Sequence, residues 1–313
     1  MKKVIVKAPA TSANLGPGYD CLGIALSLYS EFEFEESEVL GIEGCPAEYQ
    51  NEDNLVYRSF RRVYERAGLL CPKVKLCIRA DVPVARGLGS SSTCIAAGLL
   101  AADAFLAEKH PDKRRERGLK ADEAGGYFSK QELFELATEL EGHPDNAAPC
   151  LFGGLTASFM EEGLPHTVPF ACDPDWIFVT VIPDYEVKTE EARKVVKKEV
   201  GIADSIYSTS HAIAMIRALE KGDEKLLSLA AKDVLHEPYR RGLIKDYNTV
   251  REIALSRGAA AFLISGSGST MIALTKSGEK AETIRRAVKE SCPQFAVLLL
   301  QAEQNGASAK AII

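Results

Sequence analysis

RGLGSSSTC, residues 86–94, places two glycines and four hydroxyl side chains between an expected strand and a long run of small apolar residues. A chain that turns through Gly87 and Gly89 into a helix leaves the first backbone N–H groups of that helix unpaired. With the partial positive charge of the helix N-terminus, these groups bind a phosphate without any basic side chain. Serine and threonine are equally common as caps of ordinary helices. The residues alone leave two interpretations open, a phosphate-binding loop and a plain polar turn.

Three well-known motifs are absent from this segment and from the later glycine-serine turn. The Walker pattern requires a lysine, and none follows Gly89. The dinucleotide pattern GxGxxG needs a glycine where the chain has Ser92, and the later turn has Met271 at the corresponding place. The nucleophile elbow GxSxG is missing from both turns. These absences argue against a Walker NTPase, a Rossmann dehydrogenase and an α/β-hydrolase.

The bulk composition is that of a globular chain with about two domains. Its 313 residues are 46% apolar and 26% charged, and 38 Lys and Arg against 44 Asp and Glu give a formal charge of −6. This balance argues against a broad nucleic-acid or membrane surface. The eight cysteines include no CxxC pair, so neither a disulfide framework nor a zinc site is expected. With no signal-peptide core and no apolar run of roughly 18 residues, we expect a cytoplasmic protein.

Hydrophobic periodicity predicts a first half that is strand-rich and then helical, and a second half that interleaves the two. The charged, glycine-containing residues 109–130 are typical of an exposed insertion. A domain boundary is expected near residues 160–175, so we assign 1–165 and 166–313 to the two domains of an α+β enzyme. Strands are expected over 2–8, 26–35, 74–82, 176–183, 260–264, 270–275 and 295–301, and helices over 54–68, 91–107, 131–142, 189–200, 205–221, 224–236 and 245–257.

Three further segments combine glycine with polar side chains. They are PATSANLGPGYDCLG at residues 9–23, EGHPDNAAP at 141–149 and ISGSGSTM at 264–271. Each alone is ordinary, because loops collect Asn, Asp and Gly in any protein. Their occurrence together carries more weight than any one of them.

With the glycine-serine segment, these stretches resemble in order the signature segments of the GHMP kinases: PATSANLGPGYD, PVARGLGSSS, ELEGHPDNAAP and LISGSGST. HEPYRRGLI at 236–244 and KTEEAR at 188–193 are similar to the homoserine kinase branch in particular. The resemblance implies an α+β N-terminal domain, a ferredoxin-like C-terminal domain and ATP bound between them. It also implies transfer of the γ-phosphate of MgATP to the side-chain hydroxyl of L-homoserine, within threonine biosynthesis.

The resemblance assigns residues to ATP and magnesium. A serine of the loop and a glutamate of the following helix hold magnesium in this family. Ser91 fits the first, and for the second we favour Glu139 over Glu141. Asn54 is assigned to adenine by its position only, and the turn ISGSGST is expected to pack against the nucleotide loop. The expected ATP-binding set is Gly87, Leu88, Gly89, Ser90, Ser91, Ser92 and Asn54.

The substrate residues are assigned in the same way. L-Homoserine is a zwitterion, so its site needs a carboxylate clamp and an acceptor for the ammonium group. Arg193 and Arg240 match the two arginines of the family, and a planar guanidinium binds carboxylate bidentately. Asp20 would accept the ammonium group, with His143 lining the site.

The expected mechanism depends on whether a base exists. Asn14 and Asn146 would orient the hydroxyl, and Thr189 would help to position the phosphoryl group. Mevalonate-type kinases use an aspartate near the acceptor, which would be Asp145, whereas the homoserine branch has asparagine there. Loose phosphoryl transfer needs little early deprotonation, so we expect catalysis by alignment without a dedicated base.

Two other functions are compatible with the sequence. A GHMP kinase for mevalonate or a related alcohol would use the paired arginines but needs no ammonium acceptor, so Asp20 discriminates. A nucleotide-binding regulator without activity would have lost the magnesium ligands or the serine loop, and neither loss is evident. A homodimer is expected from the family, and the acidic balance argues against a nucleic-acid partner.

Overall fold

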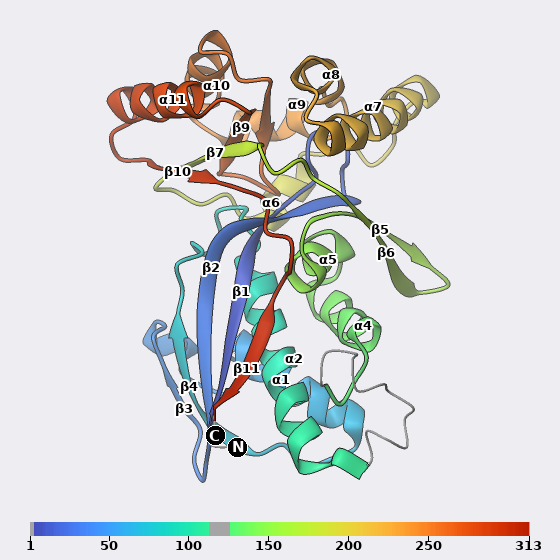
Figure 1. The fold of residues 1–313 in the computed structure, drawn as a ribbon, viewed down its shortest axis with the longest axis vertical. Helices are drawn as coiled ribbons and strands as arrows, with labels where there is room; N and C mark the ends of the chain where they lie inside the picture. The colour runs from blue at the N-terminus through green and yellow to red at the C-terminus, as the bar shows by residue number, and fades with distance from the viewer. Residues whose placement is uncertain (1–2, 113–125, 313) are drawn as a thin grey trace.

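The computed structural model describes residues 3–112 and 126–312, so most of the insertion predicted at 109–130 lies outside the described residues. Two domains lie along the long axis of the molecule (Figure 1). In the described part of the chain, the first domain contains a seven-stranded sheet and the second a four-stranded sheet. Helices accompany both sheets, which confirms the predicted α+β fold.

The first sheet is built around two long antiparallel strands. β1 pairs with β2 from Lys3 opposite Glu35 to Ala13 opposite Gly23. The strand order is β11-β1-β2-β4-β3, and β5 joins β2 and carries β6 beside it. The strands are β1 (Lys3–Ala13), β2 (Leu22–Ser37), β3 (Gly41–Glu43), β4 (Lys73–Arg79), β5 (Leu155–Glu161), β6 (Leu164–Phe170) and β11 (Ser308–Ile312).

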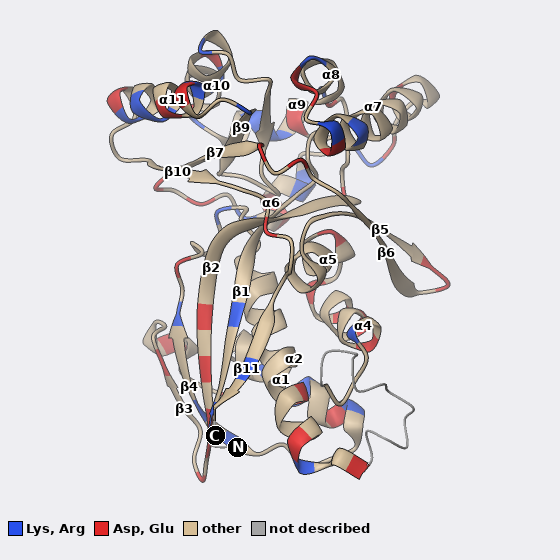
Figure 2. Ribbon diagram, in the orientation of Figure 1, with Lys and Arg blue, Asp and Glu red and all other residues tan. Residues whose placement is uncertain are grey.

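The two faces of this sheet differ as the alternation along β2 predicts. Phe32 and Phe34 are buried under the helices. Glu33 lies on the other face and pairs with Lys3 of β1 at 2.5 Å. Figure 2 shows acidic bands on β2 and basic bands on the neighbouring β1 and β11. Cross-strand pairs of opposite charge therefore cover the face that no helix covers.

The helices of the first domain pack against one face of the sheet (Figure 1). α2 lies in the core, and the Cβ of any side chain at Gly98 would lie 2.2 Å from the Val56 carbonyl oxygen of α1. Among the described residues, α2 alone is long and apolar enough to span a membrane, and two-thirds of its most apolar window is buried inside the domain. These helices are α1 (Leu55–Ala67), α2 (Ser90–Lys109), α4 (Lys130–Glu141) and α5 (Pro144–Phe152).

The second domain has the ferredoxin-like arrangement that the family resemblance implies. Its antiparallel strands run in the order β10-β7-β9-β8, with helices between β7 and β8 and α11 between β9 and β10. The strands are β7 (Ile177–Ile182), β8 (Ala261–Ile264), β9 (Met271–Thr275) and β10 (Ala296–Leu300). The helices are α6 (Thr189–Lys194), α7 (Ile202–Lys221), α8 (Glu224–Ala230), α9 (Glu237–Arg240), α10 (Tyr247–Ser256) and α11 (Gly278–Ser291).

The end of β6 at Phe170 lies within the range of 160–175 predicted for the domain boundary, but the limit assigned at residue 165 falls inside β6. This strand pairs along its whole length with β5 and so belongs to the first sheet. The assignment of all of 166–313 to the second domain is also wrong, since β11 returns to pair with β1. The first domain therefore contains residues up to Phe170 and the last strand. The residues of the second domain are inserted in the sequence between these two parts of the first domain.

Candidate active site

A cavity of about 480 Å³ lies where the two domains meet. Seven segments that are far apart in the sequence line it: the β1–β2 loop, the start of α1, the loop before α2 with the first turns of α2, the α4–α5 junction, α6, α9 and the β8–β9 turn. The structure therefore brings together most of the predicted site. The predicted residues that line the cavity are Asn14, Asp20, Gly87, Gly89, Ser90, Ser91, His143, Asn146, Thr189, Arg193 and Arg240.

Both glycines of the loop before α2 adopt left-handed backbone conformations, with φ of 76° at Gly87 and 66° at Gly89. Neither position has room for a side chain. A Cβ at Gly87 would lie 2.3 Å from the Ser265 carbonyl oxygen, and one at Gly89 would lie 1.9 Å from Thr11 Oγ1. The loop is thus packed against β1 and against the β8–β9 turn, as we predicted for that turn.

The carbonyl groups of this loop are used by the surrounding chain. Thr270 N donates to the Arg86 carbonyl at 3.1 Å, and Ser265 Oγ donates to the Gly87 carbonyl at 2.6 Å. Thr11 N donates to the Leu88 carbonyl at 3.1 Å. By contrast, no protein hydrogen bond in the described chain uses the backbone N–H groups of residues 87–92 as donors. The carbonyl groups of the loop therefore bond to the surrounding chain, and its N–H groups remain free at the N-terminus of α2. Such a row of free N–H donors binds anions.

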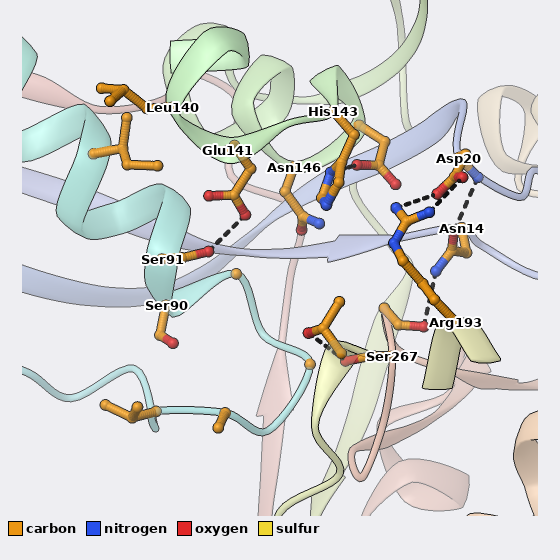
Figure 3. A pocket seen from close by; sticks show the side chains of 18 of the residues that line it. Asn14, Asp20, Ser90, Ser91, Leu140, Glu141, His143, Asn146, Arg193 and Ser267 are labelled. Atoms are coloured by element: carbon orange, nitrogen blue, oxygen red, sulfur yellow. Dashed lines mark hydrogen bonds and ion pairs between the residues drawn. The ribbon is translucent and has the colours of Figure 1, made fainter. Parts of the chain in front are cut away.

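The glutamate beside Ser91 is Glu141. Glu139, which we favoured as the magnesium ligand, does not line the cavity. Ser91 Oγ donates to Glu141 Oε1 at 2.6 Å inside the cavity (Figure 3). Glu139 instead accepts from Arg62 at 3.0 and 3.1 Å, outside the cavity, and over half of its side chain is exposed. Two residues along an α-helix rotate the side chain by about 200°, so the two glutamates face opposite ways.

The Ser91 and Glu141 oxygens fit a magnesium ion. Magnesium takes oxygen ligands and is usually held by one or two carboxylates together with substrate phosphates. Within residues 3–112 and 126–312, no group of three or more His, Cys, Asp or Glu side chains could hold a metal ion by itself. A magnesium ion here would therefore depend on phosphate oxygens for the rest of its ligands.

Three residues of the predicted ATP-binding set do not line the cavity. Asn54 caps α1: its Oδ1 accepts from Val56 N at 2.9 Å, and its Nδ2 donates to the Tyr49 carbonyl at 2.8 Å. The side chains of Leu88 and Ser92 are buried in the protein. Leu88 and Ser92 can therefore offer only backbone N–H groups, and Asn54 has a structural role in this position.

The cavity has an apolar side that motif reasoning missed. Leu140 lies beside Ser91, away from the charged residues at the other end (Figure 3). Such residues carry no chemical signature in a sequence, because an apolar side chain in a ligand site looks like any core residue. The apolar residues that line the cavity are Leu55, Val84, Ala85, Ile95 and Leu140.

Asp20 and Arg193 form a bidentate ion pair at the opposite end (Figure 3). Both N–O distances are 3.0 Å, and each side chain is more than one-third exposed to solvent. Asn14 supports this end, since its Oδ1 accepts from Asp20 N at 3.0 Å and its Nδ2 donates to the Gly266 carbonyl at 2.8 Å. Asn14 and Asp20 both have positive φ, which Asn and Asp tolerate better than most residues.

Arg240 is a buried cation without an acidic partner. It is 2% exposed, and it donates to the Ala192 and Gly266 carbonyls at 3.2 and 2.9 Å. Its guanidinium lies 5.0 Å from the centre of the Tyr19 ring. No carboxylate of the described chain pairs with it, and burial lowers its pKa. A buried unpaired charge is costly, so this end of the cavity favours an anionic ligand.

The N-terminus of α5 supplies a His143–Asp145 pair and the amide of Asn146 to the cavity. His143 Nδ1 and Asp145 Oδ1 are 2.7 Å apart, and Asp145 is 2% exposed. Burial lowers the pKa of His143, but the hydrogen bond and the negative charge of Asp145 outweigh burial and raise it above its usual value. Asn146 Oδ1 accepts from Thr11 Oγ1 at 2.7 Å, which leaves the Asn146 amide N–H groups free to face the cavity. Thr189 Oγ1 lies 3.4 Å from the Ser267 hydroxyl at the cavity edge.

Comparison with known proteins identifies the class of protein that this fold and site define. The family described as GHMP kinases N terminal domain matches residues 54–154, and GHMP kinases C terminal matches residues 215–294. These two matches include the glycine-rich loop and most of the ferredoxin-like domain. The chain belongs to the GHMP kinases.

Individual relatives show to which branch of the GHMP kinases the chain is similar. The chain is 39% identical to homoserine kinase of Clostridium beijerinckii over 92% of this chain and 90% of that protein. It is 41% identical to homoserine kinase of Thermosynechococcus vestitus over 94% and 93%. The crystal structure of homoserine kinase from Cytophaga hutchinsonii has a TM-score of 0.82 at 25% identity and covers 99% of this chain and 98% of that one. The chain belongs to the homoserine kinase family.

Proposed function

We propose that this protein is an ATP-dependent homoserine kinase that converts L-homoserine to O-phospho-L-homoserine in threonine biosynthesis. The similarity to homoserine kinases over nine-tenths of the chain supports this function. One observation in the structure carries it: free backbone N–H groups lie at one end of the cavity, while an acid and two guanidinium groups lie at the other. The first end suits phosphates, and the second suits a zwitterion.

ATP is the phosphate donor in this proposal. The backbone N–H groups of residues 87–92 bind its triphosphate, and the apolar side of the cavity receives the base. Ser91 and Glu141 hold the magnesium ion, which supplies neutralisation of the phosphate charge. The donors are fixed before the substrate arrives, because the loop carbonyls are tied to β1 and to the β8–β9 turn.

L-Homoserine takes the charged end. Asp20 accepts the ammonium group, and Arg240 and Arg193 bind the carboxylate. In the structure Asp20 and Arg193 bind each other, so the substrate must replace an existing ion pair. A zwitterion can do so without leaving either charge unpaired, because it brings one charge of each sign. Mevalonate carries no ammonium group, and its binding would leave Asp20 without a cation.

The hydroxyl is oriented by Asn146 in this proposal, with Thr189 beside the transferred phosphoryl group. Asn14 has both ends of its amide engaged, so we assign it a positioning role for Asp20. The nearest acid, Asp145, is bonded to His143 and nearly fully buried. We therefore retain catalysis by alignment. The hydroxyl oxygen attacks the γ-phosphorus, the bond to ADP breaks, and the hydroxyl proton is released as the ester forms.

Phosphorus NMR of a mixture of the enzyme, ATP, magnesium and L-homoserine tests the activity. We expect a new phosphate monoester resonance that appears only with homoserine, together with ADP. A parallel reaction with mevalonate at equal concentration should be much slower. Faster phosphorylation of mevalonate would contradict the substrate, and ATP consumption that no amino alcohol changes would contradict the kinase assignment.

The cytoplasmic location and the homodimer stay predictions. Light scattering on the purified protein tests the second of them. A mass of twice 33.9 kDa would support a homodimer, and a mass of 33.9 kDa would contradict it.

A further inference from the structure

A second cavity, of about 470 Å³, lies on the C-terminal domain among α8, α9, α10 and β8. It shares no lining residue with the cavity between the domains. Eight of its lining residues carry polar or charged side chains that the proposed reaction does not use: Ser228, Lys232, Asp233, Glu237, Arg241, Tyr247, Asn248 and Arg251.

The cationic side chains of this cavity are unpaired. Lys232, Arg241 and Arg251 are exposed, and none of them forms an ion pair or a side-chain hydrogen bond with any residue that the structure describes. Asp233 also lines the cavity, but its side chain is fully buried and accepts three backbone N–H groups of the turn that follows it, at 2.6 to 2.8 Å. It is therefore engaged locally, and the cavity keeps an excess of positive charge.

Two buried side chains also present unused polar atoms to this cavity. Glu237 is 8% exposed; its Oε1 accepts from Ile264 N at 2.7 Å, and its second oxygen has no hydrogen-bond partner in the described chain. Tyr247 is 6% exposed and packs edge-on against Phe262, and its hydroxyl has no partner among the same residues. Both residues are more than nine-tenths buried, and the polar atoms that the described chain leaves without a partner belong to residues that line the cavity, where a ligand can reach them.

The charge state of Glu237 makes it a donor. Burial raises its pKa to about 8, and Asp233 adds to this, while Arg251 and Arg240 oppose it. At neutral pH the carboxyl group is therefore mostly protonated, and its free O–H can donate. The Tyr247 hydroxyl can donate as well, since burial raises its pKa. Glu237 and Tyr247 therefore add two donors to those of the three cationic side chains.

We propose that this cavity is a binding site for a small phosphate-type dianion, either free phosphate or a phosphate monoester. A tetrahedral dianion offers only acceptors, which matches two guanidinium forks, one ammonium group, a carboxylic acid and a phenol. A cation would be repelled, and a neutral ligand would leave the three positive charges unpaired. The short helix α9 connects the two cavities, because it begins with Glu237 of the second cavity and ends with Arg240 of the first.

Crystals of the full-length protein soaked in selenate test this site directly, because selenium in a tetrahedral dianion gives an anomalous signal. We expect a peak between Arg241 and Arg251 in the wild-type protein and in the control Arg257→Gln. Arg257 follows the same helix α10, is exposed and does not line the cavity. The double variant Arg241→Gln/Arg251→Gln should lose the peak. A selenate peak at the glycine-rich loop alone would overturn the proposal.

Calorimetry with sulfate gives the same test in solution. The double variant should bind at this site at least about tenfold more weakly, since it loses two charge-assisted contacts. Parallel titrations with inorganic phosphate and with glycerol phosphate identify the source, because the tighter of the two shows whether the site takes the free ion or an ester. Equal sulfate binding by the wild-type protein and the double variant would overturn the proposal.

The substitution Glu237→Gln gives a further readout that a structural role alone would not produce. Sulfate stays a dianion from pH 6 to 9, so a change in its affinity reports the protein. Wild-type affinity should fall as the pH rises through about 8, where Glu237 ionises and repels the anion. Glu237→Gln keeps an N–H donor and cannot ionise, so its affinity should stay level. An identical pH profile for both proteins would contradict the part assigned to Glu237.

Discussion

The two cavities hold their charges in different ways. In the first, Asp20 and Arg193 neutralise each other, and only the buried Arg240 lacks an acidic partner. In the second, the exposed cations form no ion pair with any described residue, and burial raises the pKa of the neighbouring Glu237 to about 8. Arg240 and Arg241 are adjacent in the sequence, yet each lines a different cavity. The different charge balance of the two cavities is the basis of the two proposals, a zwitterion for the first and a dianion for the second.

Removing the unpaired cation of the first cavity should have the largest effect. Arg240→Met should lower kcat/KM for homoserine by about 10²- to 10³-fold, because the substrate carboxylate loses a buried, hydrogen-bonded partner. Most of the loss should appear in KM. The control Arg257→Met removes an exposed arginine that lines neither cavity, and it should change kcat/KM by less than about twofold. Steady-state kinetics on both variants, with melting curves to confirm folding, makes the measurement; a normal homoserine KM for Arg240→Met would contradict the role of this residue.

The next effect concerns magnesium and compares two glutamates of one helix. Glu141→Gln should raise the magnesium concentration needed for half-maximal activity by about 10- to 100-fold, since a ligand oxygen loses its charge. Glu139→Gln removes only an exposed ion pair with Arg62, whose contribution to stability is about 1 kcal/mol at most. Its magnesium dependence should match that of the wild type. Equal magnesium dependence for the two variants would contradict the assignment of Glu141.

This pair of glutamates shows what the sequence could and could not predict about the site. The four ordered motifs, together with the segments KTEEAR and HEPYRRGLI, were enough to predict most of the lining residues. The choice between Glu139 and Glu141 depends on the rotation of α4 relative to α2, which the spacing to His143 does not define. Asn54 was assigned to adenine by its position only, but its side chain caps α1. A capping residue and a ligand residue look alike in a sequence.

The fold was predictable where the signal was local. The strand predicted over 26–35 and the helix predicted over 54–68 both appear in the structure, as β2 and α1. The last strand, β11, was not predicted, because all five of its residues are exposed and its sequence SAKAI has little apolar pattern. It forms because the edge of β1 is free to pair, a contact between the two ends of the chain. Such pairing, and with it the domain boundary, depends on tertiary structure.

A smaller effect is expected at the buried acid of the first cavity. Asp145→Asn should lower kcat by less than about tenfold if alignment dominates, whereas loss of a general base costs about 10²- to 10⁴-fold. The same change should lower the pKa of His143, because the hydrogen bond and charge that raise it are lost. Protonated His143 would then lose its proton at a lower pH than in the wild type, which an NMR titration measures. A loss in kcat near 10⁴-fold with normal homoserine binding would identify Asp145 as the base.

The smallest expected effect is the rise in melting temperature caused by sulfate, which distinguishes binding at the second cavity from binding at the first. Sulfate at ten times its dissociation constant should stabilise the folded state by about 1.4 kcal/mol for each site it fills, and for a chain of this size that raises the melting temperature by about 2–4 °C. The free N–H groups of residues 87–92 also attract sulfate, but ADP should occupy them. With saturating ADP present, the wild-type protein should still be stabilised by sulfate, because the second cavity stays open. Arg241→Gln/Arg251→Gln should lose that remaining shift and Arg257→Gln should keep it. If ADP alone abolishes the sulfate effect in the wild type, the anion binds only at the glycine-rich loop, and the two cavities do not differ in the way their charges indicate.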